Sequence, residues 1–85
     1  MFYVYIIESA TSLKWYYGYT ERPGERIKEH NSNHHHYTAN KGPWVLIFLR
    51  EFNTKKEALV FEKKLKSLRN KRFILEEFAQ YFLKR

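Results

Sequence analysis

The sequence predicts an α+β fold, a three-stranded antiparallel sheet flanked by helices in the order ββαβαα. Two observations predict it. Three runs rich in β-branched and aromatic residues have the composition of strands, and the stretches between and after them carry helix start signals or apolar residues at helical spacing. A chain of 85 residues is too short to divide its apolar residues between two cores, so we expect one domain covering residues 1–85.

The two N-terminal runs indicate an antiparallel hairpin. Phe2–Ile7 and Lys14–Tyr19 are separated by the polar segment Glu8–Leu13. Tyrosine is so frequent here that the phenol rings could either pack across the hairpin or take part in chemistry, and composition leaves both interpretations open. Alternation along a strand places Tyr3 and Tyr5 on one face, opposite to the residue between them.

A short helix and a polar loop follow the hairpin. Pro23 suits the first turn of a helix, because its missing N–H would have no helical partner there, and Glu25–His30 continues the helix. Its only large apolar residue is Ile27. The segment 31–42 has little apolar content and contains three consecutive histidines, so we expect a loop.

The C-terminal half predicts one strand and two helices. Trp44–Leu49 is almost continuously apolar, which is typical of a strand covered on both faces. Thr54, with Glu57 three residues later, has the pattern of a helix-capping box. Two apolar stripes at spacings of three and four predict a helix after Thr54 and a final helix from about Lys71. The stripes consist of Ala58, Phe61, Leu65 and Leu68, and of Ile74, Phe78, Tyr81 and Phe82.

Composition excludes several classes of protein. The chain has no cysteine, which removes disulfide frameworks and cysteine-based zinc sites and fits the reducing cytoplasm. The apolar start is too short and lacks the basic flank of a signal peptide, and no segment approaches the ~20 apolar residues of a membrane span. We therefore expect a cytoplasmic protein with no membrane partner.

Positive charge is concentrated in the last third of the chain. The net charge is +7, and residues 54–85 contain ten Lys or Arg side chains against four Glu. Such a basic segment favours a polyanionic partner through Coulomb attraction and counterion release, although a solubilising charged face would have the same composition.

Two positions on the predicted helices could carry chemistry. Arg26 and His30 are four residues apart and therefore share one helix face, where the guanidinium could hold a phosphate and the imidazole could move a proton. Arg26 could equally pair with Glu25 or Glu29. Glu62 falls at the rim of the apolar stripe, where it is either a ligand for a hard cation or a partner of Lys66 or Arg69.

The histidine run is a weaker candidate. His34, His35 and His36 lie in the expected loop, without a further ligand at a spacing typical of zinc sites. Contacts with phosphates or bases suit these side chains better than a transition-metal site, and the sequence leaves their role open.

Four segments, taken in order, resemble the GIY-YIG nuclease domain. The two signature tripeptides of that family correspond to Tyr3–Tyr5 and Tyr16–Gly18, and the eleven-residue spacing between their tyrosines suits the family. Arg26 stands where the family places its essential arginine, and EALVFEKKLK is similar to the helix whose glutamate binds metal, which maps that role to Glu62. The match covers most of the chain and resembles the small stand-alone branch related to the N-terminal nuclease domain of the UvrC repair protein.

The sequence also departs from the family pattern. Tyr3 replaces the first glycine of the signature, and Tyr17 stands where isoleucine or valine is usual. Many larger members have an asparagine about twelve residues beyond the metal glutamate, where this chain has Ile74. Asn70 is not in register with that position.

The resemblance implies a metal-dependent endonuclease that hydrolyses phosphodiester bonds, with a role in DNA repair or recombination. Glu62 would hold Mg²⁺ or Mn²⁺ and Arg26 would neutralise the phosphoryl group, while Tyr5 would activate the attacking water, assisted by Tyr16 and by His30 as a proton relay. A phenol has a pKa of ~10, so this role for Tyr5 requires nearby positive charge. The basic residues expected to contact nucleic acid are Lys55, Lys56, Lys63, Lys66, Arg69, Lys71 and Arg72.

Two other functions remain open. The chain could be a non-catalytic nucleic-acid-binding module that keeps the fold, using basic residues together with rings that stack on bases. It could also be a protein-interaction domain on the nuclease scaffold. We favour DNA as the partner, but the sequence does not distinguish DNA from RNA or identify the form of the substrate, the pathway or the oligomeric state.

Overall fold

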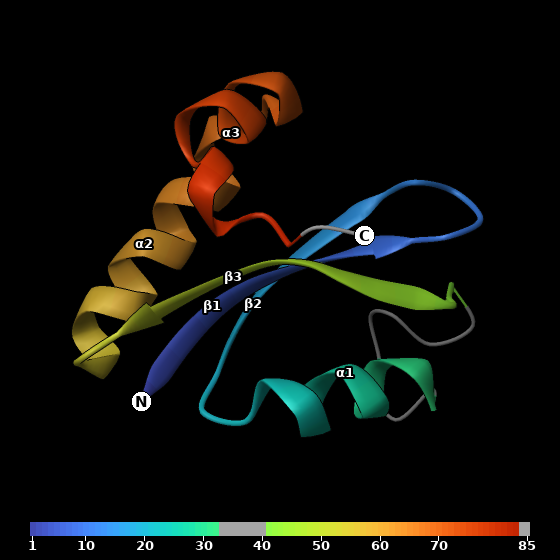
Figure 1. Cartoon of the computed structure of the whole chain (residues 1–85), viewed down its shortest axis with the longest axis horizontal. Helices are drawn as coiled ribbons and strands as arrows, with labels where there is room; N and C mark the ends of the chain where they lie inside the picture. The colour runs from blue at the N-terminus through green and yellow to red at the C-terminus, as the bar shows by residue number, and fades with distance from the viewer. Residues whose placement is uncertain (33–40, 84–85) are drawn as a thin grey trace.

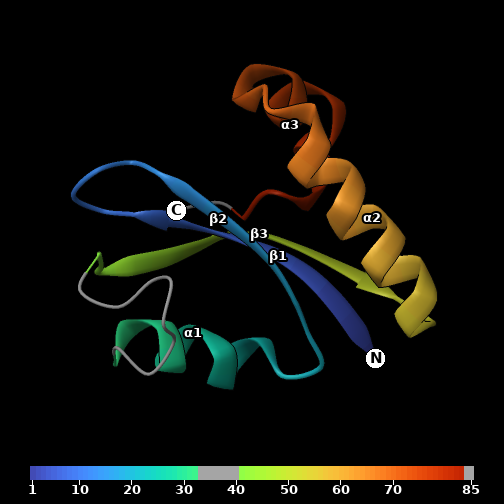
Figure 2. The same cartoon turned by 180° about the vertical axis from the view of Figure 1, so that it is seen from behind.

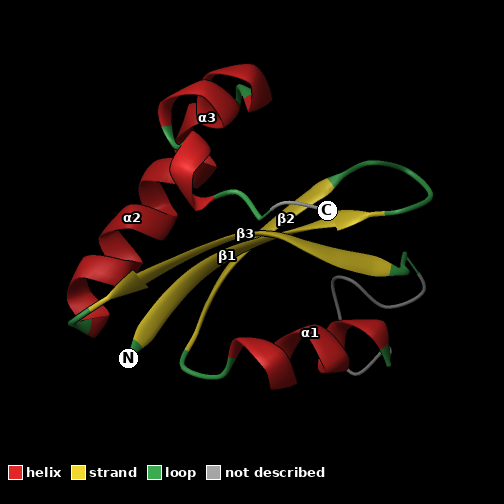
Figure 3. Cartoon of the chain, viewed as in Figure 1, coloured by secondary structure: helices red, strands yellow, loops and turns green. Residues whose placement is uncertain are grey.

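The computed structural model describes residues 1–32 and 41–83 and has the expected ββαβαα order (Figures 1 and 3). Three antiparallel strands form one sheet in the spatial order β2-β1-β3, so β1 is central. The strands are β1 (Phe2–Ser9), β2 (Trp15–Thr20) and β3 (Trp44–Phe52). The helices are α1 (Pro23–Asn31), α2 (Lys55–Leu68) and α3 (Lys71–Glu77), followed by a 3₁₀ turn at Ala79–Tyr81. The prediction of an α+β fold is confirmed.

The helices lie on opposite sides of the sheet (Figures 1 and 2). We call the two sides the α1 face and the α2 face, and α3 lies on the same side as α2. Alternate residues of β1 point to the two faces: Val4 and Ile6 belong to a core on the α2 face, while Tyr5 and Ile7 belong to a smaller cluster on the α1 face. No helix within the described ranges is long and apolar enough to cross a membrane.

The hairpin is longer than expected on its first strand. Glu8 and Ser9, assigned to the loop from sequence, extend β1 because they pair with residues of the neighbouring strands, including Trp15 and Trp44. The strand that is covered on both faces is β1, where all four residues of the range Val4–Ile7 are buried, and not Trp44–Leu49 as the sequence predicted. β3 is a sheet edge, and its Val45 is 39% exposed.

The α2 face carries an apolar core. Phe48 and Leu65 are fully buried there, beside the half-buried ring of Tyr81. The predicted cap at Thr54 is confirmed, because the Glu57 backbone N–H donates to Thr54 Oγ1 at 3.2 Å, and the Thr54 hydroxyl donates to Glu57 Oε1 at 2.9 Å. The predicted stripe is also confirmed: Ala58 and Phe61 are buried with Leu65, and Leu68 packs at the edge of the core.

The final helix is shorter than predicted. It ends at Glu77, and the following residues form the 3₁₀ turn and then an extended segment. The chain leaves the helix because its end returns to the sheet: the Leu83 N–H donates to the Ile47 carbonyl at 2.9 Å, and Phe82 bridges Phe48. Tyr81 and Phe82 therefore pack as the sequence pattern suggests, but from outside a helix.

The α1 face is held by fewer side chains. Tyr5, Ile7 and Trp44 form its buried cluster, with Ile27 of α1 packed against them. The Asn31 side chain accepts from the Trp44 N–H at 2.6 Å and donates to its carbonyl at 3.0 Å, which fixes the end of α1 to the start of β3. His34, His35 and His36 of the expected loop lie outside the described residues.

Candidate active site

Tyr5 is at the centre of the α1 face. Its side chain is 2% exposed, and its hydroxyl lies 2.8 Å from Nε2 of His30. Its ring lies over Gly18, its partner across the β1–β2 pair, and a Cβ added at Gly18 would collide with the Tyr5 ring and hydroxyl. The glycine of the second signature tripeptide therefore provides the space in which the phenol lies.

Tyr16 and His30 complete an aromatic group around this hydroxyl. Tyr16 lies on β2, and its ring meets the His30 ring edge to face at a centroid separation of 5.0 Å. His30 lies near the end of α1 and is fully buried, with its ring 5.8 Å from that of Tyr5. The imidazole is therefore shielded from water and held between two phenols.

Arg26 lies one helical turn before His30. Its Nε is 3.2 Å from Oε1 of Glu29, and its side chain is 37% exposed. Pairing with Glu29 was one of the two alternatives considered for Arg26, and the contact is present. The guanidinium also faces Tyr5 closely enough to lower the pKa of the phenol. Arg26 thus has an acidic neighbour but remains partly open to solvent beside the phenol.

Glu62 lies on α2 and is also close enough to Tyr5 to act on its hydroxyl. Its side chain is 17% exposed, and its Oε2 lies 3.4 Å from Lys66 Nζ. The rim position and the pairing with Lys66 agree with the sequence pattern. The Glu62 carboxylate also acts on Tyr5, raising the pKa of its hydroxyl. The structure thus brings together all five residues to which the sequence assigned chemistry: Tyr5, Tyr16, Arg26, His30 and Glu62.

The surroundings keep Tyr5 protonated. Burial is the largest cause that raises its pKa far above 10, and the neighbouring Tyr16 and Glu62 add to this effect. The positive charge of Arg26 lowers the pKa but does not cancel the other contributions. The positive charge of the neighbouring protein groups is therefore insufficient to make a phenolate near neutral pH. His30 Nε2 lies at hydrogen-bonding distance from the phenol hydroxyl.

The donor set suits a hard cation held mainly by water and substrate. Within the described part of the chain, no three His, Asp or Glu side chains are grouped so that they could hold a metal ion. Mg²⁺ often takes only one or two protein carboxylates and completes its shell with waters and phosphate oxygens. Glu62, a partly exposed carboxylate at the edge of the tyrosine cluster, fits that mode of binding.

The seven basic residues predicted to contact nucleic acid are all exposed. Several of them also have partners within the protein. Arg72 Nε lies 3.1 Å from Glu76 Oε1, and Lys55 Nζ lies 5.9 Å from the centre of the Tyr19 ring. Lys71 Nζ donates to the Leu13 carbonyl at 2.8 Å. A polyanion could reach all seven side chains, but Lys55, Lys71 and Arg72 would have to give up their contacts within the protein to bind it.

The position that departs from the family pattern is explained by packing. Ile74 is fully buried in the core of the α2 face, so it has no access to a bound phosphate. Asn70 instead caps α3, because its Oδ1 accepts from the Phe73 N–H at 3.0 Å. The pairing of Tyr5 with His30 was not specified by the sequence, since the two residues are 25 positions apart. The only signal was that His30 shares a helix face with Arg26.

Comparisons with known proteins identify a similar domain family and similar chains. The model of the GIY-YIG catalytic domain matches residues 1–74. The UPF0213 protein BH0048 of Halalkalibacterium halodurans is 40% identical over 67 residues, which are 78% of this chain and 70% of that protein. The UPF0213 protein YazA of Bacillus subtilis is 41% identical over 59 residues, or 68% of this chain and 60% of YazA.

A solved structure is also similar. The solution NMR structure of the UPF0213 protein BH0048 from Bacillus halodurans superposes with a TM-score of 0.57 and 35% identity. The match covers 94% of this chain and 85% of that one. Because identity and coverage are both high, the similarity extends beyond a shared chain topology.

Proposed function

Because the chain belongs to the GIY-YIG family, we propose that it is an endonuclease that hydrolyses phosphodiester bonds of nucleic acid with the help of a divalent cation. The observation that carries the proposal is the meeting of Tyr5, His30, Arg26 and Glu62, which come from three different elements of the fold. An apolar core does not require a buried phenol–imidazole pair beside a guanidinium and a carboxylate.

Tyr5 and His30 would act as a proton relay. The Tyr5 oxygen accepts a proton from the attacking water while its own proton passes to His30 Nε2, which lies 2.8 Å away. The phenol therefore activates water without forming a free phenolate, which its raised pKa disfavours. The relay requires His30 to carry its first proton on Nδ1, so that Nε2 can accept.

Arg26 and a divalent cation held by Glu62 would stabilise the negative charge of the phosphate. The Arg26 guanidinium is partly exposed and can neutralise charge that develops on the phosphoryl oxygens. Glu62 would hold Mg²⁺ or Mn²⁺, which supplies Lewis-acid polarisation of the phosphate and stabilises the leaving oxygen. The Tyr16 ring, packed against His30, would help to orient the imidazole and the attacking water.

The test is nicking of supercoiled plasmid by the full chain with Mg²⁺ or Mn²⁺. We expect cleavage that stops on chelation of the cation, and we expect Arg26→Ala and Glu62→Ala each to lower the rate by about 10²–10³-fold. Lys28→Ala, which removes an exposed cation from the same helix as Arg26, is the matched control and should cleave at a similar rate to the unchanged protein. Cleavage that survives both substitutions would contradict the proposed site.

DNA is the substrate that we propose, with a role in repair or recombination in the cytoplasm. The exposed lysines and arginines of residues 54–83 suit contacts with phosphates, so we expect these residues to recognise nucleic-acid shape rather than a long base sequence. Comparing cleavage of duplex DNA, branched DNA and RNA of matched sequence would separate these substrates.

A non-catalytic nucleic-acid-binding module is the second candidate. It is favoured by the absence of the family asparagine at the buried Ile74 and by the exposed lysines of α2. Salt-sensitive binding of DNA without cleavage in Mg²⁺ or Mn²⁺ would support this candidate instead of the nuclease.

A further inference from the structure

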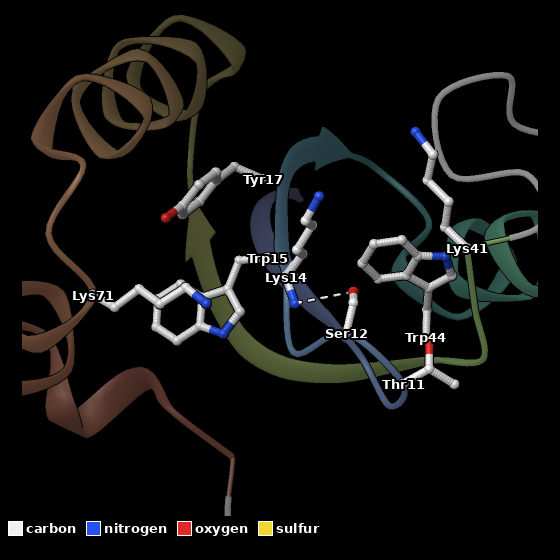
Figure 4. Close-up of a pocket in the computed structure, with 8 residues that line it drawn as sticks. All are labelled: Thr11, Ser12, Lys14, Trp15, Tyr17, Lys41, Trp44 and Lys71. Atoms are coloured by element: carbon white, nitrogen blue, oxygen red, sulfur yellow. Dashed lines mark hydrogen bonds between the residues drawn. The ribbon is translucent and has the colours of Figure 1, made fainter.

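A cavity of about 420 Å³ lies at the hairpin end of the sheet (Figure 4). This volume is within the range of about 300–1,000 Å³ that is usual for sites of small ligands. Its wall contains three basic and three aromatic side chains, and no acidic residue is among the described residues that line it. These six residues are Lys14, Lys41, Lys71, Trp15, Tyr17 and Trp44.

The aromatic part of the wall is held in place by neighbouring groups. The Trp15 indole N–H donates to Glu8 Oε2 at 3.0 Å, and the Tyr17 ring meets the Trp15 ring edge to face at 6.2 Å. Trp44 is 4% exposed and is fixed through its backbone by Asn31. Figure 4 draws Ser12 and Lys14 between the two tryptophan rings. Trp15 and Tyr17 are only partly buried, so their rings are suited to stacking on a flat ligand, and little side-chain freedom remains to be lost. Trp44 is too deeply buried to stack on a ligand and forms part of the cavity wall.

A cation is positioned beside this aromatic wall. Lys71 Nζ lies 5.0 Å from the centre of the Trp15 ring while it donates to the Leu13 carbonyl. Lys14 enters the cavity from the hairpin and is exposed. Aromatic rings with ammonium groups nearby match a nucleotide, in which an anionic phosphate is joined to a base with a π face. Lys71 lies over the Trp15 ring, so a base that stacks on this face would displace the ammonium group towards its phosphate. A purely acidic ligand would use the lysines but not the rings.

The cavity is connected to the candidate active site by β2. Trp15 and Gly18 are three residues apart on this strand, which corresponds to about 10 Å. Trp15 and Tyr17 pack on the α2 face, whereas Tyr16 packs with Tyr5 on the α1 face. β2 is an edge strand of the sheet, so a nucleic-acid strand that joins the cavity to the candidate active site would pass around this edge. A few nucleotides of a nucleic-acid strand can cover this distance.

We propose that the cavity binds an unpaired nucleotide of the substrate, with the base against the Trp15 and Tyr17 rings and its phosphate against Lys14 and Lys71. The inference rests on the proposed function and narrows its substrate to nucleic acid that has a single-stranded extension or branch next to the cleaved bond. Bases inside a continuous duplex are stacked on each other and cannot enter the cavity.

Intrinsic fluorescence tests occupation directly, because both tryptophans of the chain line the cavity. The full chain is titrated with single-stranded oligothymidylate in the presence of a chelator, so that no cleavage occurs. We expect saturable quenching by the oligonucleotide and no quenching by polyglutamate, which carries charge without bases. Absence of quenching by oligothymidylate, or equal quenching by polyglutamate, would overturn the proposal.

Affinity measurements test the substrate class. In chelator, we expect a duplex with a single-stranded extension to bind about tenfold more tightly than the same duplex with blunt ends. Lys14→Met and Lys71→Met should each reduce this ratio, whereas Lys63→Met, which removes one exposed charge from α2, should weaken both duplexes equally. Equal reduction of the ratio by all three substitutions would show a general charge effect and overturn the site.

The two proposals fail in distinguishable ways. If the protein nicks plasmid but shows no preference for the extended duplex, the cavity proposal is wrong and the nuclease proposal stands. If it prefers the extended duplex but does not cleave any form of nucleic acid, the cavity proposal stands and the chain is a binding module.

Discussion

The two faces of the sheet bury similar strand residues but use them differently. On the α2 face, Val4 and Ile6 join Phe48 and Leu65 in a core made of hydrocarbon and aromatic rings. On the α1 face, the alternate residues of the same strand lead to a buried phenol bonded to a buried imidazole. Burying hydrogen-bonding groups yields less net stability than burying apolar groups. We therefore assign the larger share of stability to the α2 face and the proposed chemistry to the α1 face, together with Glu62 from α2.

The largest effect on stability is expected from the α2 face. Leu65→Ala should lower the free energy of unfolding by about 2–5 kcal/mol, because Leu65 is fully buried and its removal leaves a cavity. Leu59→Ala is the matched control on the same helix: Leu59 is 39% exposed, so its loss should change stability by about 0.5 kcal/mol or less. Denaturant unfolding measures both. Leu65 lies one turn from Glu62 on α2, so this pair of variants tests stability and not cleavage.

A smaller change on the α1 face should affect cleavage more than folding. Gly18→Ala places a methyl group against the Tyr5 ring and hydroxyl, so the phenol must move away from His30. We expect cleavage to fall by about 100-fold, since a displacement of ~1 Å at a reacting group costs that much. Gly24→Ala in α1 is the control, because its added methyl group would meet nothing within 4 Å. Equal plasmid nicking by the two variants would contradict the role given to Gly18.

The smallest expected effect is a change in how stability depends on alkaline pH. Burial raises the pKa of Tyr5 in the folded protein, so the folded state keeps its phenol proton at pH values where the unfolded chain, with a pKa of ~10, has released it. The stability that depends on the protonated Tyr5 is fully present below pH ~10. Above this pH the free energy of unfolding falls by up to about 1.4 kcal/mol per pH unit. Tyr3, Tyr17 and Tyr19 also have raised pKa values and add to the loss. Unfolding of Tyr5→Phe should therefore depend less steeply on pH above 10, and an identical slope would contradict a buried phenol.

Local patterns in the sequence were sufficient to predict the elements. The cap at Thr54, the stripe through Leu65 and the proline at the start of α1 are each decided by residues within a turn or two of the helix. The end of the last helix was not predictable in this way. It depends on Leu83 and Phe82 pairing with β3, which is distant in the chain.

The proximity of the candidate site residues follows from the predicted pattern, but the environment of the phenol does not. Arg26 and Glu62 were placed by spacing and by resemblance to a family, and the structure brings both beside Tyr5. The protonation of the Tyr5 phenol depends on its burial, and its hydroxyl contacts His30. No local sequence pattern predicts either of these features. The lysines and rings of the hairpin cavity were likewise not recognised as a group, because Lys14, Trp44 and Lys71 come from three separate segments.

The relay between Tyr5 and His30 is the central claim, and the cleavage rate of Tyr5→Phe tests it most directly. This substitution removes one oxygen atom and leaves the ring over Gly18, so the variant should still unfold cooperatively. We expect its rate of plasmid nicking at saturating divalent cation to fall by about 10²–10⁴-fold, the usual contribution of a proton-transfer group. A folded Tyr5→Phe protein that nicks plasmid at the rate of the unchanged chain would contradict the account.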